Sequence, residues 1–112
     1  MRDEIRDLFE RRRLVLIAGP CVIESESLCV DIAGFLKEAC AARGVGLIFK
    51  ASFDKANRTS LKSFRGPGLE AGLAVLSRVR REFDLAVLTD IHEPAQAAPA
   101  AAEDRPGMNA AR

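Results

Sequence analysis

The chain has 112 residues with 17 basic and 16 acidic side chains, so its formal net charge is +1. This balance gives no overall field that would attract nucleic acid or an anionic membrane, and no apolar run approaches the ~20 residues of a membrane span. Three cysteines without paired spacing fit a reducing compartment better than a disulfide framework. We therefore expect a cytoplasmic protein without a nucleic-acid or membrane partner, whose functional charge is local.

Three apolar runs, rich in β-branched residues, predict the strands of a parallel sheet. They are residues 14–18, 45–49 and 85–89, and polar residues do not alternate within them. Strands of this kind are covered on both faces. The highly charged residues 1–13 precede the first run, and we interpret them as an N-terminal flank with no assigned function.

Two amphipathic helices are predicted between these runs. Apolar residues recur with a helical period over residues 28–42, and Gly44 is placed to end that helix. A second helical period spans residues 69–83, after Pro67, which suits a helix start. The order strand, helix, strand, helix, strand predicts right-handed crossovers and a parallel α/β sheet.

Residues that can do chemistry follow each predicted strand. Cys21 comes after the first strand, a basic segment at residues 50–65 after the second, and Asp90 and His92 after the third. Active sites of a (β/α)₈ barrel are built at this end of the strands, and a doubly wound sheet also binds ligands there. The first turn, residues 19–21, lacks the glycine spacing of a dinucleotide or P-loop fingerprint.

The basic segment has the composition of a phosphate site. Small hydrogen-bonding residues are interleaved there with five cations and a single acid, namely Lys50, Lys55, Arg58, Lys62 and Arg65 with Asp54. A solvated basic loop is the plain alternative. Fixed cations and hydroxyl or amide donors at the end of a buried strand are, however, how proteins hold phosphate.

Four motifs, taken in order, resemble the 3-deoxy-D-manno-octulosonate 8-phosphate synthase family. They are AGPCVIES at 18–25, KASFDKANRTS at 50–60, SFRGPGLE at 63–70 and TDIHEP at 89–94. The related 3-deoxyheptulosonate 7-phosphate synthases share the first motif but typically carry Lys-Pro-Arg-Thr-Ser-Pro after the second strand. That second family is therefore the weaker alternative.

The resemblance covers roughly residues 14–100 and implies the amino-terminal part of a (β/α)₈ barrel, with about three βα units. It also implies an enzyme that condenses phosphoenolpyruvate with arabinose 5-phosphate in lipopolysaccharide precursor synthesis. A homo-oligomer is expected for the complete enzyme.

The resemblance implies roles for the residues that match the motifs of the family. Lys50, Ser52 and Lys55 are expected to bind phosphoenolpyruvate or the aldehyde end of the sugar, with Lys55 polarising the carbonyl. Asp90 is expected to contact a sugar hydroxyl or water. His92 is expected as a polar partner, although a structural hydrogen bond explains this histidine equally well.

The resemblance also implies a sugar-phosphate site and a metal ligand. Asn57, Arg58 and Thr59 are expected to hold arabinose 5-phosphate, because the planar fork of arginine suits phosphate oxygens. Cys21 resembles the cysteine of the metal-dependent class, and a thiolate suits a divalent Fe, Zn or Mn ion. The further ligands, a His, a Glu and an Asp, are expected from later strands, so this chain alone should hold no metal stably.

The sequence departs from the family near its end. We expect residues 101–112 to form an irregular tail, because Pro99, Pro106 and Gly107 disfavour a helix or strand interior. A barrel needs ~250 residues, so we interpret the tail as a truncation or a shifted reading frame.

Two hypotheses of different classes follow. The first is the amino-terminal part of the synthase, and the second is a non-catalytic barrel fragment that at most binds phosphorylated ligands. The fragment would aggregate or associate with itself or with an intact subunit, because the first and third predicted strands would be unpaired edges.

Overall fold

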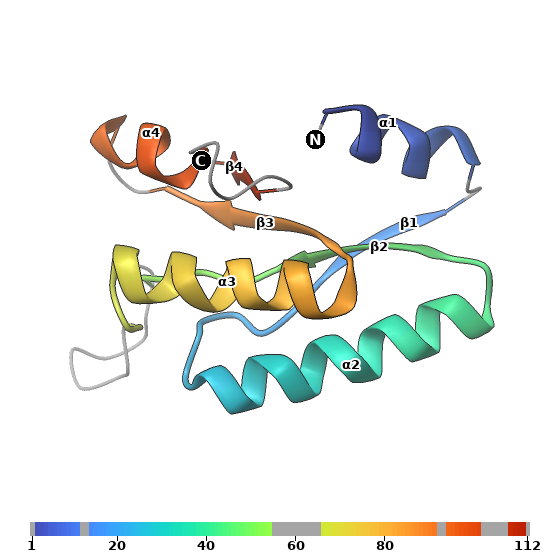
Figure 1. Cartoon of the computed structure of the whole chain (residues 1–112), viewed down its shortest axis with the longest axis horizontal. Helices are drawn as coiled ribbons and strands as arrows, with labels where there is room; N and C mark the ends of the chain where they lie inside the picture. Colours follow the sequence, from blue (N-terminus) through green and yellow to red (C-terminus); the bar gives the residue numbers. More distant parts are fainter. Residues whose placement is uncertain (1, 12–13, 55–65, 92–93, 102–107, 112) are drawn as a thin grey trace.

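The computed structural model describes residues 2–11, 14–54, 66–91, 94–101 and 108–111. Its elements form a four-stranded sheet with helices on both sides (Figure 1). In chain order they are α1 (Arg2–Arg11), β1 (Val15–Ala18), α2 (Glu26–Ala42), β2 (Gly46–Lys50), α3 (Leu69–Phe83), β3 (Ala86–Asp90), η1 (Pro94–Gln96), α4 (Ala97–Ala100) and β4 (Met108–Ala111).

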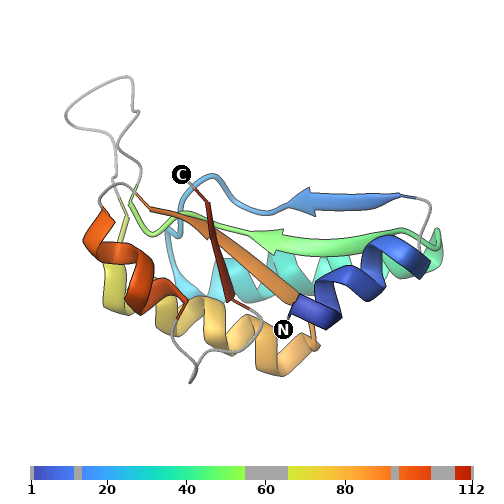
Figure 2. The ribbon, with the colours of Figure 1, turned by 90° about the horizontal axis from the view of Figure 1, so that it is seen from above.

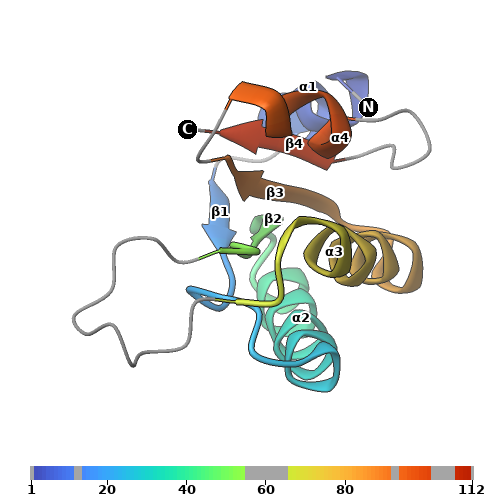
Figure 3. The ribbon, with the colours of Figure 1, turned by 90° about the vertical axis from the view of Figure 1, so that its left-hand side faces the viewer.

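All strands of the sheet are parallel, in the order β1-β2-β3-β4. The helices α2 and α3 lie side by side on one face of this sheet, while α1 and α4 lie on the other side (Figures 1 and 3). The predicted parallel α/β arrangement is confirmed, and it is consistent with part of a (β/α)₈ barrel.

Both long helices begin and end where local chemistry favours it. The Ser25 side chain caps α2 by accepting a hydrogen bond of 3.1 Å from the backbone N–H of Leu28. The turn after α2 has Gly44 at φ +66°, and α3 ends at Asp84, which is left-handed at φ 52°. The two helices predicted from periodicity are therefore confirmed to within about two residues.

Alternate residues of each inner strand face the two long helices. Leu47, Phe49, Leu85 and Val87 pack there against buried residues of α2 and α3. Phe49 and Phe53 are almost fully buried, and burial of such a side chain contributes roughly 1.5–3 kcal/mol. This helix-facing layer is the hydrophobic core.

The strand β1 is less covered than its sequence predicted. Leu16 is 41% exposed and Ile17 is 50% exposed, although they point to opposite faces of the sheet. The cause is position, since β1 lies at the edge of the sheet with β2 as its strand neighbour on one side (Figure 2). The expectation of a strand covered on both faces was wrong for β1.

The expectation for the end of the chain also needs correction. We expected residues 101–112 to be irregular and β3 to be an edge, but β4 pairs in parallel with β3 and takes the edge position. Pro106 and Gly107 precede β4 in the sequence, so they do not interrupt its ladder. Pro99 stands within the first turn of α4, where a missing N–H is tolerated.

In the part of the chain that the structure describes, no helix is long and apolar enough to span a bilayer.

Close packing fixes the segment that leaves β2. A Cβ atom at Gly72, in the first turn of α3, would lie 2.3 Å from the Cβ atom of Phe53. The backbone N–H of Gly68 also donates a 3.1 Å hydrogen bond to the carbonyl of Phe53. The start of α3 therefore holds Phe53 in the core, just beyond the end of β2.

We predict that Gly72→Ala lowers the free energy of unfolding by about 1–3 kcal/mol, because the added methyl group would displace Phe53. Urea unfolding of the chain measures this loss. Gly34→Ala is the matched control, since its Cβ atom would lie 3.4 Å from a side-chain atom of Phe83 and alanine favours the helix by about 0.8–1 kcal/mol. Equal losses in the two variants would contradict the packing argument.

Candidate functional site

The predicted site residues of β2 and β3 lie on the sheet face that points away from α2 and α3. Lys50, the last residue of β2, is exposed and pairs in register with Leu88 of β3. Side chains alternate between faces along a strand, so Lys50, Ser52 and Asp90 share this face. The carboxyl ends of two neighbouring strands thus present a cation, a hydroxyl and a carboxylate together.

A direct side-chain contact joins two of these residues. The Ser52 hydroxyl donates a hydrogen bond of 2.5 Å to Oδ1 of Asp90. The contact follows from the register, because two residues beyond the Lys50–Leu88 pair the chain reaches Ser52 and Asp90. An ionised carboxylate is an acceptor only, so the single Ser52 proton is committed to Asp90.

The turn after β1 comes close to the same place. The backbone N–H of Ile23 donates a 3.0 Å hydrogen bond to the carbonyl of Ser52. A Cβ atom at Gly19 would lie 1.8 Å from the carbonyl oxygen of Lys50, a space that only glycine leaves open. The ends of β1, β2 and β3 therefore meet, as their sequence predicted.

Cys21 lies in this turn with its thiol side chain exposed. By contrast, Cys29 and Cys40 are buried, and burial raises the pKa of the Cys29 thiol to about 11. A thiol held neutral in this way is a poor metal ligand. Of the three cysteines, Cys21 is thus the one with the exposure that a ligand needs.

The described residues do not by themselves assemble a metal centre. No group of three or more His, Cys, Asp or Glu side chains suited to one ion occurs among them. One cysteine leaves most coordination positions of a divalent ion unfilled. Any site at Cys21 would need ligands from elsewhere.

Five predicted site residues fall outside the part of the chain that the structure describes. They are Lys55, Asn57, Arg58, Thr59 and His92.

Thr89 is a site-adjacent residue that the sequence analysis did not predict. Its side chain is buried beside the site and donates a 2.9 Å hydrogen bond to the carbonyl of Ala51. The sequence feature that could have indicated this residue is a hydroxyl side chain at the end of an otherwise apolar strand, directly before Asp90.

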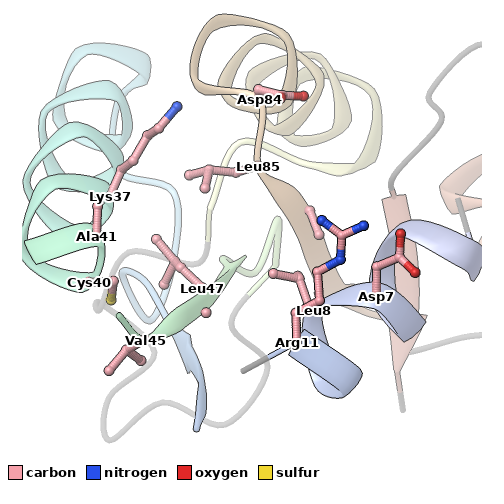
Figure 4. A pocket seen from close by; sticks show the side chains of 12 residues that line it. Asp7, Leu8, Arg11, Lys37, Cys40, Ala41, Val45, Leu47, Asp84 and Leu85 are labelled. Carbon is pink, nitrogen blue, oxygen red and sulfur yellow. The ribbon is translucent and has the colours of Figure 1, made fainter. Parts of the chain in front are cut away.

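A separate cleft of ≈ 330 Å³ lies at the opposite, amino ends of β2 and β3 (Figure 4). It is lined by apolar residues and two charges of each sign, among them Leu8, Leu47, Leu85, Arg11, Lys37, Asp7 and Asp84. The Lys37 ammonium donates to the carbonyl of Phe83 and so caps the end of α3. Of the predicted site residues that the structure describes, none lines this cleft.

Residues 10–103 match the model of the DAHP synthetase I family. A protein of Paracidovorax citrulli is 63% identical over 81 residues, which are 72% of this chain and 28% of that protein. A protein of Fusobacterium nucleatum is 54% identical over 83 residues, 74% of this chain and 30% of that protein.

A third relative, from Legionella pneumophila strain Corby, is 56% identical over 80 residues, 71% of this chain and 29% of its own length. All three relatives bear the name 2-dehydro-3-deoxyphosphooctonate aldolase. The chain thus spans about three tenths of the length of the curated relatives it matches.

Proposed function

Because the chain belongs to the DAHP synthetase I family, we propose that it supplies the first βα units of a barrel that condenses phosphoenolpyruvate with D-arabinose 5-phosphate. Water is consumed, and the products are 3-deoxy-D-manno-octulosonate 8-phosphate and phosphate. The names of the relatives favour this reaction over that of the 3-deoxyheptulosonate 7-phosphate synthases. The complete enzyme would be a homo-oligomer in the cytoplasm, and its product would serve lipopolysaccharide precursor synthesis.

One observation carries the proposal: Lys50 lies beside the Ser52–Asp90 pair at the carboxyl ends of adjacent parallel strands. An ammonium group attracts the carboxylate or phosphate of phosphoenolpyruvate. A carboxylate instead accepts hydrogen bonds from hydroxyl groups and repels anions, so Asp90 suits a sugar hydroxyl or water. Lys50 would therefore bind the anionic phosphoenolpyruvate, while Asp90 would bind a hydroxyl group of the sugar or a water molecule.

The chemical step would use the segment that follows β2. We assign to Lys55 the polarisation of the sugar aldehyde, so that the enol carbon of phosphoenolpyruvate attacks a more electrophilic carbon. Asn57, Arg58 and Thr59 would hold the sugar phosphate. Water then adds to the phosphate-bearing carbon and phosphate leaves. His92 would act as a polar partner next to Asp90.

We predict that Lys50→Ala raises the KM for phosphoenolpyruvate about ten- to a hundredfold. The reason is the loss of one charge-assisted contact, which contributes about 1.5–3 kcal/mol to binding. The assay uses a hybrid barrel, in which this chain replaces the matching segment of the Paracidovorax citrulli relative. Lys37→Ala is the control, because it removes the same charge at the other end of the sheet. An equal rise in KM for both variants would remove Lys50 from the substrate site.

We further propose that Cys21 is a ligand of a divalent Fe, Zn or Mn ion in the complete barrel. Its exposed thiol at the end of β1 supports this role, and the remaining ligands would come from strands outside this chain. When bound, such an ion would orient substrate or water as a Lewis acid.

The metal assignment predicts that the purified hybrid barrel contains about one divalent ion per chain and that Cys21→Ser loses most of it. Elemental analysis measures the content. Cys40→Ser is the control, since Cys40 is buried on α2 and should leave the metal content unchanged. Full metal content in the Cys21 variant would overturn the assignment.

The alternative, a non-catalytic fragment, concerns the 112 residues taken by themselves. Leu14 is 63% exposed, and with Leu16 and Ile17 it forms an apolar edge at β1 without charged residues. Such an edge lacks the features that discourage pairing with another chain. The chain alone would therefore associate with itself or with an intact subunit.

We predict that the 112-residue chain releases no phosphate from phosphoenolpyruvate and arabinose 5-phosphate and sediments as an oligomer or aggregate. The reasons are the incomplete set of cations and metal ligands and the open β1 edge. Phosphate release and sedimentation velocity are measured on the same preparation, with the hybrid barrel as the positive control. A monomer that turns over substrate would refute this prediction.

A further inference from the structure

Thr89 stands out because it is a polar side chain buried within an apolar layer. Its exposed fraction is 0%, and among the described residues it is the one polar side chain in the buried class. It lies on the helix-facing side of β3, in line with Leu85 and Val87 of the core. Burying a hydroxyl costs free energy unless it is hydrogen-bonded, and valine would have nearly the same shape.

The hydrogen bond of Thr89 reaches the backbone of the site. Its hydroxyl donates over 2.9 Å to the carbonyl of Ala51, which is itself fully buried. Ala51 links Lys50 to Ser52, so this carbonyl belongs to the peptide between Ala51 and Ser52. The orientation of that peptide sets the direction in which Ser52 leaves the strand.

The contact lies where the regular strand pairing stops. The β2 strand ends at Lys50, and the N–H of Ala51 still donates to the carbonyl of Leu88 over 3.2 Å. The next residue, Ser52, pairs on the opposite side of β2, with Val22 after β1. The Thr89 side chain therefore supplies a further link between the β2 and β3 segments just beyond the last residue of β2.

Two consecutive residues of β3 thus hold two consecutive residues after β2, one on each face of the sheet. Thr89 binds the Ala51 carbonyl on the helix side, and Asp90 binds the Ser52 hydroxyl on the other side. Without the first link, the backbone would keep the Ala51 N–H bond to Leu88 and the bond from Ile23 to the Ser52 carbonyl, but the Ala51 carbonyl would lose its hydrogen bond from Thr89.

We propose that Thr89 is a positioning residue, whose buried hydroxyl fixes the Ala51–Ser52 peptide and thereby aligns Ser52 with Asp90 beside Lys50. Its importance for catalysis rests on the function proposed above, whereas the alignment itself is a property of this chain. Thr89→Val removes the hydroxyl at nearly constant shape, and Thr89→Ser keeps it.

The alignment is tested by double-mutant cycles in the 112-residue chain, with all variants compared at one protein concentration because the self-association predicted above makes apparent stability depend on concentration. Ser52→Ala, Asp90→Asn and the double variant give the coupling between the two side chains from urea unfolding, and we expect about tenfold in the unfolding constant. In the Thr89→Val background the coupling should fall below about twofold, and in the Thr89→Ser background it should persist. Coupling that stays at the wild-type value in the Thr89→Val background would overturn the proposal.

A variant of the core separates positioning from general loss of stability. Val79→Ala removes a fully buried side chain of α3 and should destabilise the chain without reducing the Ser52–Asp90 coupling. Loss of coupling in this variant too would show a general effect and overturn the specific role of Thr89.

The hybrid barrel provides a second measurement if the valine variant of the chain does not fold. There, Thr89→Val should raise the KM for phosphoenolpyruvate about tenfold with a smaller change in kcat, and Thr89→Ser should restore it. A KM unchanged by Thr89→Val would overturn the role in catalysis. An unmodified hybrid that turns over no substrate would refute the proposed function, while the cycles would still decide the alignment.

Discussion

The parallel register between β2 and β3 determines where the described site residues lie. Pairing of Ile48 with Ala86 and of Lys50 with Leu88 leaves Ser52 opposite Asp90. A slip of one residue would turn Ser52 and Lys50 to the helix-covered face, where an ammonium group would be buried without a partner. The apolar residues on the helix side, such as Phe49 and Val87, therefore specify the site as much as the polar residues do.

The helices hold this register through close contacts rather than through surface charge. The start of α3 leaves room for Phe53 only because residue 72 is glycine, and Phe53 in turn limits how the chain leaves β2. Arg78 of α3 forms ion pairs with Glu26 of α2 and with Glu82, but all three side chains are about half exposed. Such pairs contribute little to stability in water, so packing against Phe53 is the stronger constraint on the site.

The sequence predicted those features that depend on local periodicity and on strong local signals. The helix end at Gly44 and the three first strands follow from residue type and spacing. The exposure of β1 could not be predicted in this way, because it depends on what lies beside that strand. The sequence did not predict the pairing of β4, because Pro106 and Gly107 disfavour a strand and the strand begins directly after them. Thr89 was missed for a related reason, since its partner, Ala51, lies 38 residues away in sequence.

The surroundings of Lys50 also determine how strongly it could hold an anion. At an exposed strand end the effective dielectric is close to that of water, and a charge pair at about 4 Å is worth only about 1 kcal/mol. The same pair in a partly enclosed setting, with an effective dielectric near 20, is worth about 4 kcal/mol. In this chain the face that carries Lys50 and Asp90 is open on the side of β1, where Ile17 is half exposed. The residues that recognise substrate can therefore be correctly placed by two strands, yet their electrostatic strength depends on whatever encloses that face. The β2–β3 register thus determines where Lys50 and Asp90 lie, while the groups that cover this face of the sheet determine how tightly Lys50 binds an anion.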